Sequence, residues 1–182
     1  AGAADAELHM LTESMRMTRW AANDALRAEY EGAWQASGVD CAFQNAGEEG
    51  NDALRMLGRL AHYTHLTDHM RESVTRAAFP DDIEQAWSAG RRSLVQTCNG
   101  VPLAGDGLTV EGELRYVRLF FELGCRMMHL TYNRRNPIGD GCAEPGNAGL
   151  SDFGRATVAE LNRCGIIIDV AHSGWQTCLE TA

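Results

Sequence analysis

Three polar side chains in this sequence fall one or two residues beyond short segments that we expect to be β-strands. They are Asn99 after Ser93–Cys98, Tyr132 after Cys125–Thr131, and His172 after Ile166–Val170. A histidine can bind a metal ion or transfer a proton, and a phenol can donate a hydrogen bond to an oxyanion. Folds of the α/β class place their chemistry at the carboxyl ends of parallel strands. By position alone, His172 is equally well a core histidine, Asn99 a turn residue before Gly100, and Tyr132 a solvated tyrosine.

The segments that position these residues alternate between helices and strands. The expected helices are Thr12–Ala36, Asn51–Ala78, Asp81–Ala89, Thr109–Gly124, the stretch between a capping Ser151 and Gly165, and the turns from Trp175. The expected strands are Val39–Phe43, Ser93–Cys98, Cys125–Thr131 and Ile166–Val170. This alternation predicts right-handed βαβ units with a parallel sheet. We therefore expect an α/β fold, a (β/α) barrel of TIM type with about half of the barrel in this chain, as one partial domain over 1–182.

The segment Gly149–Trp175 is the clearest of these units. Ser151 is a good N-cap, and Gly165 comes where its helix must end. The run Ile166–Val170 is almost continuously apolar, as expected for a parallel strand covered on both faces. If the strand alternates regularly, His172 shares a face with Ile168 and Val170, whereas Asp169 points the other way and orients other groups without being a ligand.

Composition excludes several classes of protein. The 182 residues carry 25 acidic and 16 basic side chains, all of the latter arginine, for a net charge of −9. An acidic balance argues against nucleic acid as the main partner. No apolar run approaches the ~20 residues that span a membrane, and the first residues do not lead us to expect a secretory signal. Six scattered cysteines without a C-x-x-C pair indicate buried thiols in a reducing compartment, so we expect a cytoplasmic protein.

Two stretches resemble the membrane (renal) dipeptidase family, metal-dependent peptidases of the amidohydrolase superfamily. They are LRYVRLFFELGCRMMHLTYNRRN, Leu114–Asn136, and GLSDFGRATVAELNRCGIIIDVAHSGW, Gly149–Trp175. The resemblance implies a barrel with one or two zinc ions at the carboxyl ends of its strands. It places His172 on a metal-ligand histidine and Asn99 on the position of a bridging glutamate. Tyr132 falls where the family has a histidine that binds substrate.

The sequence departs from the family pattern at most of the metal ligands. No His-x-Asp pair comes before Asn99, and the second ligand histidine and a late aspartate do not appear in the 182 residues. A neutral asparagine is a poorer bridge between two cations than a carboxylate. We expect either a piece of a longer protein or a degenerate member, and the last residues, which read as the start of a helix, favour the first.

Other candidates have weaker support. Arg134 and Arg135 lie in a loop of about 18 residues that is long enough to be functional, and they either hold a substrate carboxylate or are solvated. His62, His65 and His69 form a stripe on one predicted helix, but no glutamate completes a metal site, and a solvent-facing helix explains them better. Glu48 and Glu49 are loop acids that the sequence does not distinguish.

These observations lead to one function and two alternatives. We expect a zinc-dependent dipeptidase-like hydrolase in which metal-activated water attacks the peptide bond of a dipeptide. His172 and Asn99 are the expected metal-site residues, and Tyr132, Arg134 and Arg135 the substrate-binding residues. The alternatives are an inactive half-barrel that acts as a binding module or homodimer, and an amidohydrolase acting on a non-peptide amide or ester.

Overall fold

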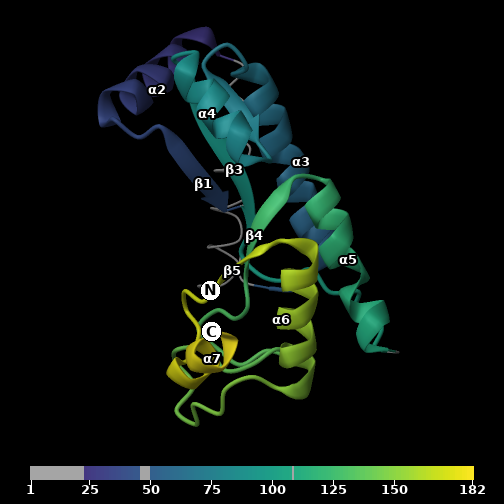
Figure 1. Ribbon diagram of the computed structural model, residues 1–182. Coiled ribbons are helices and arrows are strands. Elements are labelled where there is room, and N and C mark those ends of the chain that lie inside the picture. The colour runs from purple at the N-terminus through teal and green to yellow at the C-terminus, as the bar shows by residue number, and fades with distance from the viewer. Residues whose placement is uncertain (1–22, 46–49, 108) are drawn as a thin grey trace, which may run out of the picture. The chain divides into compact units, whose positions relative to one another are not determined.

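The computed structural model describes residues 23–45, 50–107 and 109–182. Eleven helices and strands are described within these ranges, and most of them are labelled in Figure 1. They are α2 (Asp24–Ser37), β1 (Cys41–Asn45), α3 (Ala53–His69), β2 (Val74–Ala77), α4 (Pro80–Ser88), β3 (Arg92–Cys98), α5 (Val110–Glu122), β4 (Cys125–His129), α6 (Asp152–Cys164), β5 (Ile167–Asp169) and α7 (Trp175–Thr181). None of the described helices is long and apolar enough to cross a membrane.

The chain divides into two compact units. One contains Leu60–Leu94 together with the described residues up to Ala42, and the other contains Phe43–Arg59 and Val95–Ala182. The sequence-based prediction of one domain over 1–182 stays a prediction. The first unit has a small core of Leu66, Met70, Val74 and Leu94, packed against Tyr30, Trp34 and Tyr63.

The sheet has the strand order β1-β3-β4-β5, and β2 also pairs with β3. In the second unit β3 pairs with β4, and β4 with β5, both in parallel. Helices α5 and α6 link these strands and pack against each other (Figure 1). Val117, Phe120, Met128, Leu130 and Leu161 are fully buried there. Parallel strands alternating with helices confirm the predicted α/β class.

Local sequence explains where the helices begin and end. Ser151 Oγ accepts a hydrogen bond from Gly154 N at 2.9 Å, and α6 ends at Gly165 with a φ of 79°. Thr109 caps α5 in the same way, through Gly112 N. These caps satisfy amide groups that have no partner inside the helix. The capping roles predicted for Ser151 and Gly165 are therefore confirmed.

One predicted helix is wrong in its last third, beyond His69. The predicted helix Asn51–Ala78 ends at His69 in the structure, and Val74–Ala77 form the strand β2, which makes five strands where the sequence indicated four. The reason is that Val74 and Ala77 are buried while Thr75 and Arg76 between them are more exposed, an edge-strand pattern too short to distinguish from helical spacing. Met17, Trp20 and the rest of the predicted first helix up to residue 22 lie outside the described residues.

Candidate functional site

At the carboxyl ends of β3, β4 and β5, three polar side chains contact one another in a row. Asn99 follows β3, His129 is the last residue of β4, and Asp169 is the last residue of β5. The parallel register pairs His129 directly with Asp169. His129 Nδ1 contacts Asn99 Oδ1, and His129 Nε2 contacts Asp169 Oδ2. These three residues are far apart in the sequence, and they meet because the parallel strands end at the same edge of the sheet.

His129 is the buried centre of this row, and only 6% of its surface is exposed. An imidazole has two ring nitrogens, and here each faces an oxygen of a neighbouring strand end. The ring therefore links β3 to β5 and has no nitrogen left for a ligand. The residue that follows Asn99, Gly100, leaves no room for a side chain, since a Cβ there would lie 2.0 Å from the carbonyl oxygen of Gly50.

His172 lies beyond the end of β5 in a tight turn. Asp169 Oδ1 accepts a hydrogen bond from Ala171 N at 2.8 Å, and Ser173 N donates to the carbonyl of Val170 at 3.0 Å. The turn gives His172 a φ of 62°, uncommon for a residue other than glycine. The predicted face-sharing of His172 with Ile168 and Val170 is therefore wrong, because the strand ends at Asp169 before reaching it.

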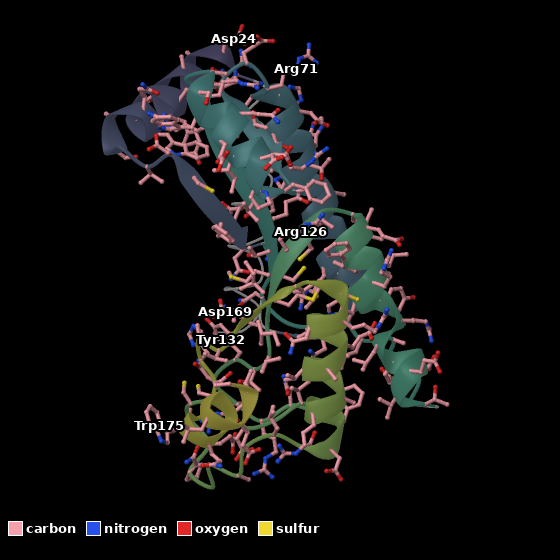
Figure 2. All side chains as sticks on the ribbon, viewed as in Figure 1. Asp24, Arg71, Arg126, Tyr132, Asp169 and Trp175 are labelled. Carbon is pink, nitrogen blue, oxygen red and sulfur yellow. The ribbon has the colours of Figure 1, made fainter. Side chains whose placement is uncertain are left out.

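The ring of His172 is held from one side by the long loop. Tyr132 stacks on it with ring centroids 4.1 Å apart and planes 20° from parallel. Asn133 Oδ1 lies 3.0 Å from His172 Nδ1. If the Nδ1 proton is donated to Asn133, Nε2 keeps its lone pair, and no described residue forms a hydrogen bond with Nε2. His172 thus has one engaged and one open ring nitrogen. Figure 2 labels Tyr132 and Asp169 at this end of the strands.

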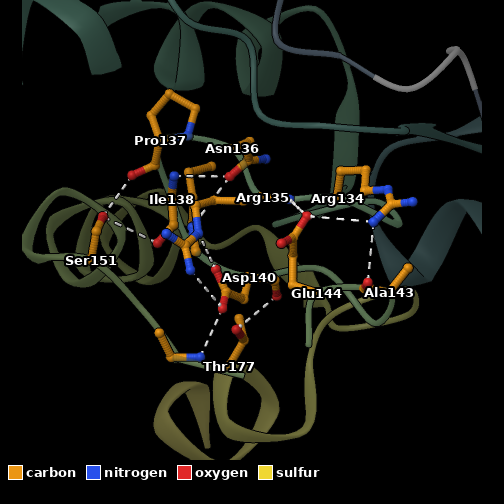
Figure 3. A network of polar contacts seen from close by, with 12 residues as sticks. Arg134, Arg135, Asn136, Pro137, Ile138, Asp140, Ala143, Glu144, Ser151 and Thr177 are labelled. Atoms are coloured by element: carbon orange, nitrogen blue, oxygen red, sulfur yellow. Dashed lines mark hydrogen bonds and ion pairs between the residues drawn. The ribbon is translucent and has the colours of Figure 1, made fainter. Parts of the chain in front are cut away.

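The long loop is anchored by a single buried carboxylate, Asp140 (Figure 3). Its oxygens accept from Arg135 Nε at 2.5 Å, Arg135 Nη2 at 3.1 Å and Ala148 N at 2.7 Å. The Arg135 guanidinium and then the Ala148 amide hold the pKa of Asp140 below its usual value. The Asp140 carbonyl accepts from Thr177 Oγ1 at 2.8 Å, which ties the loop to α7.

The two loop arginines differ in their surroundings. Arg135 is engaged by Asp140, and its backbone N–H donates to Glu144 Oε1 at 3.1 Å. Arg134 donates to the carbonyl of Ala143 at 3.2 Å and lies 4.0 Å from Glu144, and among the described residues it has no bidentate carboxylate partner such as Asp140; both arginine side chains are largely exposed. Arg134 is therefore the arginine with more freedom to meet a ligand. Substrate binding by either residue stays a prediction.

A small hollow of about 110 Å³ lies at this edge. Its lining includes Asn99, Tyr132, Arg134 and Arg135, so it contains four of the five predicted site residues. A larger hollow of about 930 Å³ lies elsewhere in the second unit, beside Leu54, Tyr116 and Phe153, and contains none of them. The predicted residues therefore gather at one place. His172 does not line the hollow itself, but its ring stacks on Tyr132, which does.

The donor atoms at this edge do not by themselves make up a metal site. Zinc needs three or four donors that converge at about 2.0–2.3 Å. Asn99 and Asp169 turn toward His129, and His172 offers a single open nitrogen. Within the described part of the chain, no group of three or more His, Cys, Asp or Glu side chains could hold an ion. Metal binding by His172 and Asn99 stays a prediction.

Sequence reasoning missed His129 and Asn133. His129 sits inside the segment CRMMHLT, which the sequence predicts as a strand and in which a histidine is not distinguished from the other strand residues. The available signal was its place at the strand end, beside Asn99 and Asp169 at the ends of the neighbouring strands. The loop acids Glu48 and Glu49 lie outside the described residues.

A comparison with protein-family models matches residues 10–182 to the model described as "Membrane dipeptidase (Peptidase family M19)". This match extends well beyond the stretches between Leu114 and Trp175 on which the sequence resemblance rested. It covers both of the compact units.

Curated relatives give the same family. Dipeptidase aclJ of Aspergillus oryzae is 31% identical over 149 residues, which cover 76% of this chain and 33% of the relative. Dipeptidase 3 of Rattus norvegicus is 32% identical over 73 residues, 37% of this chain and 15% of that protein. The chain thus spans about a third, or less, of the length of these relatives.

Solved structures share the fold. An amidohydrolase from Pseudomonas aeruginosa superposes with a TM-score of 0.73 at 26% identity, over 85% of this chain and 45% of that one. A metallo peptidase from Rhodobacter sphaeroides, liganded with a phosphinate mimic of the dipeptide L-Ala-D-Ala, gives 0.59 at 20% identity, over 71% and 37%. The predicted fold class, α/β with part of a TIM-type barrel, is confirmed.

Proposed function

Starting from a chain that belongs to the membrane dipeptidase family, peptidase family M19, we propose that the protein containing it is a zinc-dependent dipeptidase. In this proposal metal-activated water attacks the peptide bond of a dipeptide. Metal dependence and peptide hydrolysis are properties of the family's metallopeptidases, and the choice of zinc and the substrate are our own inference.

One observation in the structure carries the proposal: Tyr132, Asn133 and the turn after β5 leave the Nε2 atom of His172 open at the carboxyl edge. We assign His172 the role of one metal ligand. Asn99 and Asp169 hold His129, which fixes the strand ends around it. The proposal requires further metal donors than the described residues offer.

The substrate would lie over the small hollow beside Tyr132. The phenol of Tyr132 can donate a hydrogen bond to the oxyanion that forms on the attacked carbonyl. Arg134, exposed at the rim, can meet the carboxylate of the dipeptide. Arg135 then supports the loop through Asp140.

A substrate panel tests this proposal. Zinc-loaded protein is assayed with dipeptides, a tripeptide, and a simple ester and amide, with and without a chelator. We expect dipeptide hydrolysis that the chelator abolishes, and a kcat roughly 100-fold lower for Tyr132→Phe, because one oxyanion donor is lost. Hydrolysis of only the ester or amide would reassign the enzyme to another amidohydrolase reaction.

A non-catalytic binding module is the second candidate. Two observations favour it: Asn99 is engaged by His129, and large apolar side chains are exposed around α7, with Trp175 at 72% and Leu179 at 56% (Figure 2 labels Trp175). This candidate predicts no hydrolysis of any substrate in the panel together with a dimer in light scattering. Dipeptide hydrolysis would eliminate it.

A further inference from the structure

The exposed face of α3 carries two histidines whose rings point at each other. His65 and His69 are four residues apart, so they lie on the same side of the helix one turn from each other. Both are exposed, and their Nε2 atoms are 3.1 Å apart. The ring centroids are 4.5 Å apart with planes at 85°. Both belong to the unit that contains Leu60–Leu94.

The spacing of the two nitrogens matches that of a metal chelate. Zinc–imidazole bonds are about 2.0–2.1 Å long. Two such bonds drawn to nitrogens 3.1 Å apart meet at an angle of about 100°, between the angles of octahedral and tetrahedral coordination. A single ion can therefore lie at bonding distance from both nitrogens at their observed separation.

The position of the pair on the helix also favours a cation. His69 is the last residue of α3, and the carbonyl groups at a helix carboxyl end create a partial negative charge. The neighbouring carboxylates are engaged with arginines, since Asp68 lies 3.6 Å from Arg76 and Glu72 lies 3.8 Å from Arg71. Within the described part of the chain no third His, Cys, Asp or Glu joins the pair. The remaining coordination positions are left to water.

We propose that His65 and His69 form a surface chelating site for a divalent transition-metal ion. Imidazole nitrogens favour Cu²⁺, Ni²⁺ and Zn²⁺ over the hard cations Mg²⁺ and Ca²⁺. Among these, affinity follows the order in which Cu²⁺ binds most tightly. The site is independent of dipeptide hydrolysis. It also has a practical consequence, because a metal count on the purified protein includes an ion that takes no part in the chemistry at His172.

Calorimetric titration of Zn²⁺, Cu²⁺ and Mg²⁺ tests the site directly. It uses the full chain carrying His172→Ala, so that the carboxyl edge contributes no open histidine nitrogen, and compares that protein with His65→Ala and His69→Ala added singly. Each single variant should weaken the binding step roughly 100-fold, because the second contact of a chelate forms intramolecularly. Mg²⁺ should give no such step.

His62→Ala is the matched control, since it removes a histidine one turn earlier on the same helix. It should leave the binding step unchanged. All three side chains lie at or near the surface, so circular dichroism should show the same helix content in every variant. Zn²⁺ and Cu²⁺ binding that is unaffected by both His65→Ala and His69→Ala would overturn the proposal and leave the pair as a plain imidazole–imidazole hydrogen bond. Equal weakening by His62→Ala would overturn it too.

Discussion

The ends of β4 and β5 each present a histidine, and the two have opposite surroundings. His129 is buried, and both of its ring nitrogens contact side chains of neighbouring strand ends. His172 is exposed, sits in a turn with a φ of 62°, and has one nitrogen engaged by Asn133. The ring centroids are only 6.1 Å apart. The difference shows that closeness to the site does not decide whether a histidine can bind a ligand. What decides it is whether a ring nitrogen is left without a hydrogen-bond partner, as Nε2 of His172 is among the described residues.

The largest expected effect comes from removing the enclosed ring. His129→Ala should lower the free energy of unfolding by about 2–4 kcal/mol, because Asn99 and Asp169 lose their partner in a buried setting. Urea unfolding followed by tryptophan fluorescence measures this. His129→Gln, whose amide can replace part of the contact, should recover some of the loss if the alanine variant does not fold.

His172→Ala is the comparison for that measurement. It removes a stacked ring and one exposed contact, and should cost less than about 1 kcal/mol. If His172→Ala proves as destabilising as His129→Ala, the contrast between an enclosed and an open histidine is wrong.

A smaller effect is expected from the loop that holds the His172 ring. The pKa of Asp140 is lowered by Arg135 and by the Ala148 amide, so its ionised form stabilises the folded state at pH values above the ordinary carboxyl pKa of about 4. That stabilisation disappears as pH falls through the lowered pKa. Asp140→Asn should therefore lose less stability than the wild type when pH is lowered from about 5 to about 2.

Urea unfolding at several pH values in this range measures the difference. Glu160 and Glu180, whose pKa values are also lowered by hydrogen bonds, are present in both proteins and cancel. Glu84→Gln, an exposed carboxyl on α4, is the control and should follow the wild type. The same pH dependence in Asp140→Asn and in the wild type would show that Asp140 does not anchor the loop.

Much of the fold of the second unit could be predicted from sequence, because its signals are local. The Ser151 and Gly165 caps indicate α6, and the almost continuously apolar run Ile166–Val170 indicates β5, without tertiary information. The strand β2 could not be predicted, since four residues following a helical pattern carry no distinct period. Its formation depends on pairing with β3.

The residues of the candidate site also divide into those that local sequence signals predict and those that depend on tertiary contacts. Asn99, Tyr132 and His172 could be found because each follows a predicted strand, where α/β folds place their chemistry. His129 was missed because its importance comes from the register of β4 against β5, which places it opposite Asp169. Asn133 was missed because its contact with His172 spans 39 positions and depends on the path of the loop.

The role of His172 as a metal ligand is tested most directly by the zinc content of the purified protein that contains this chain together with the further metal donors, measured by mass spectrometry after removal of the surface pair. In a His65→Ala, His69→Ala background, zinc should remain bound at the carboxyl edge, and adding His172→Ala should release it. Zinc that is retained without His172, or that is already absent from the background protein after zinc loading, would contradict the claim that His172 holds the metal of this site.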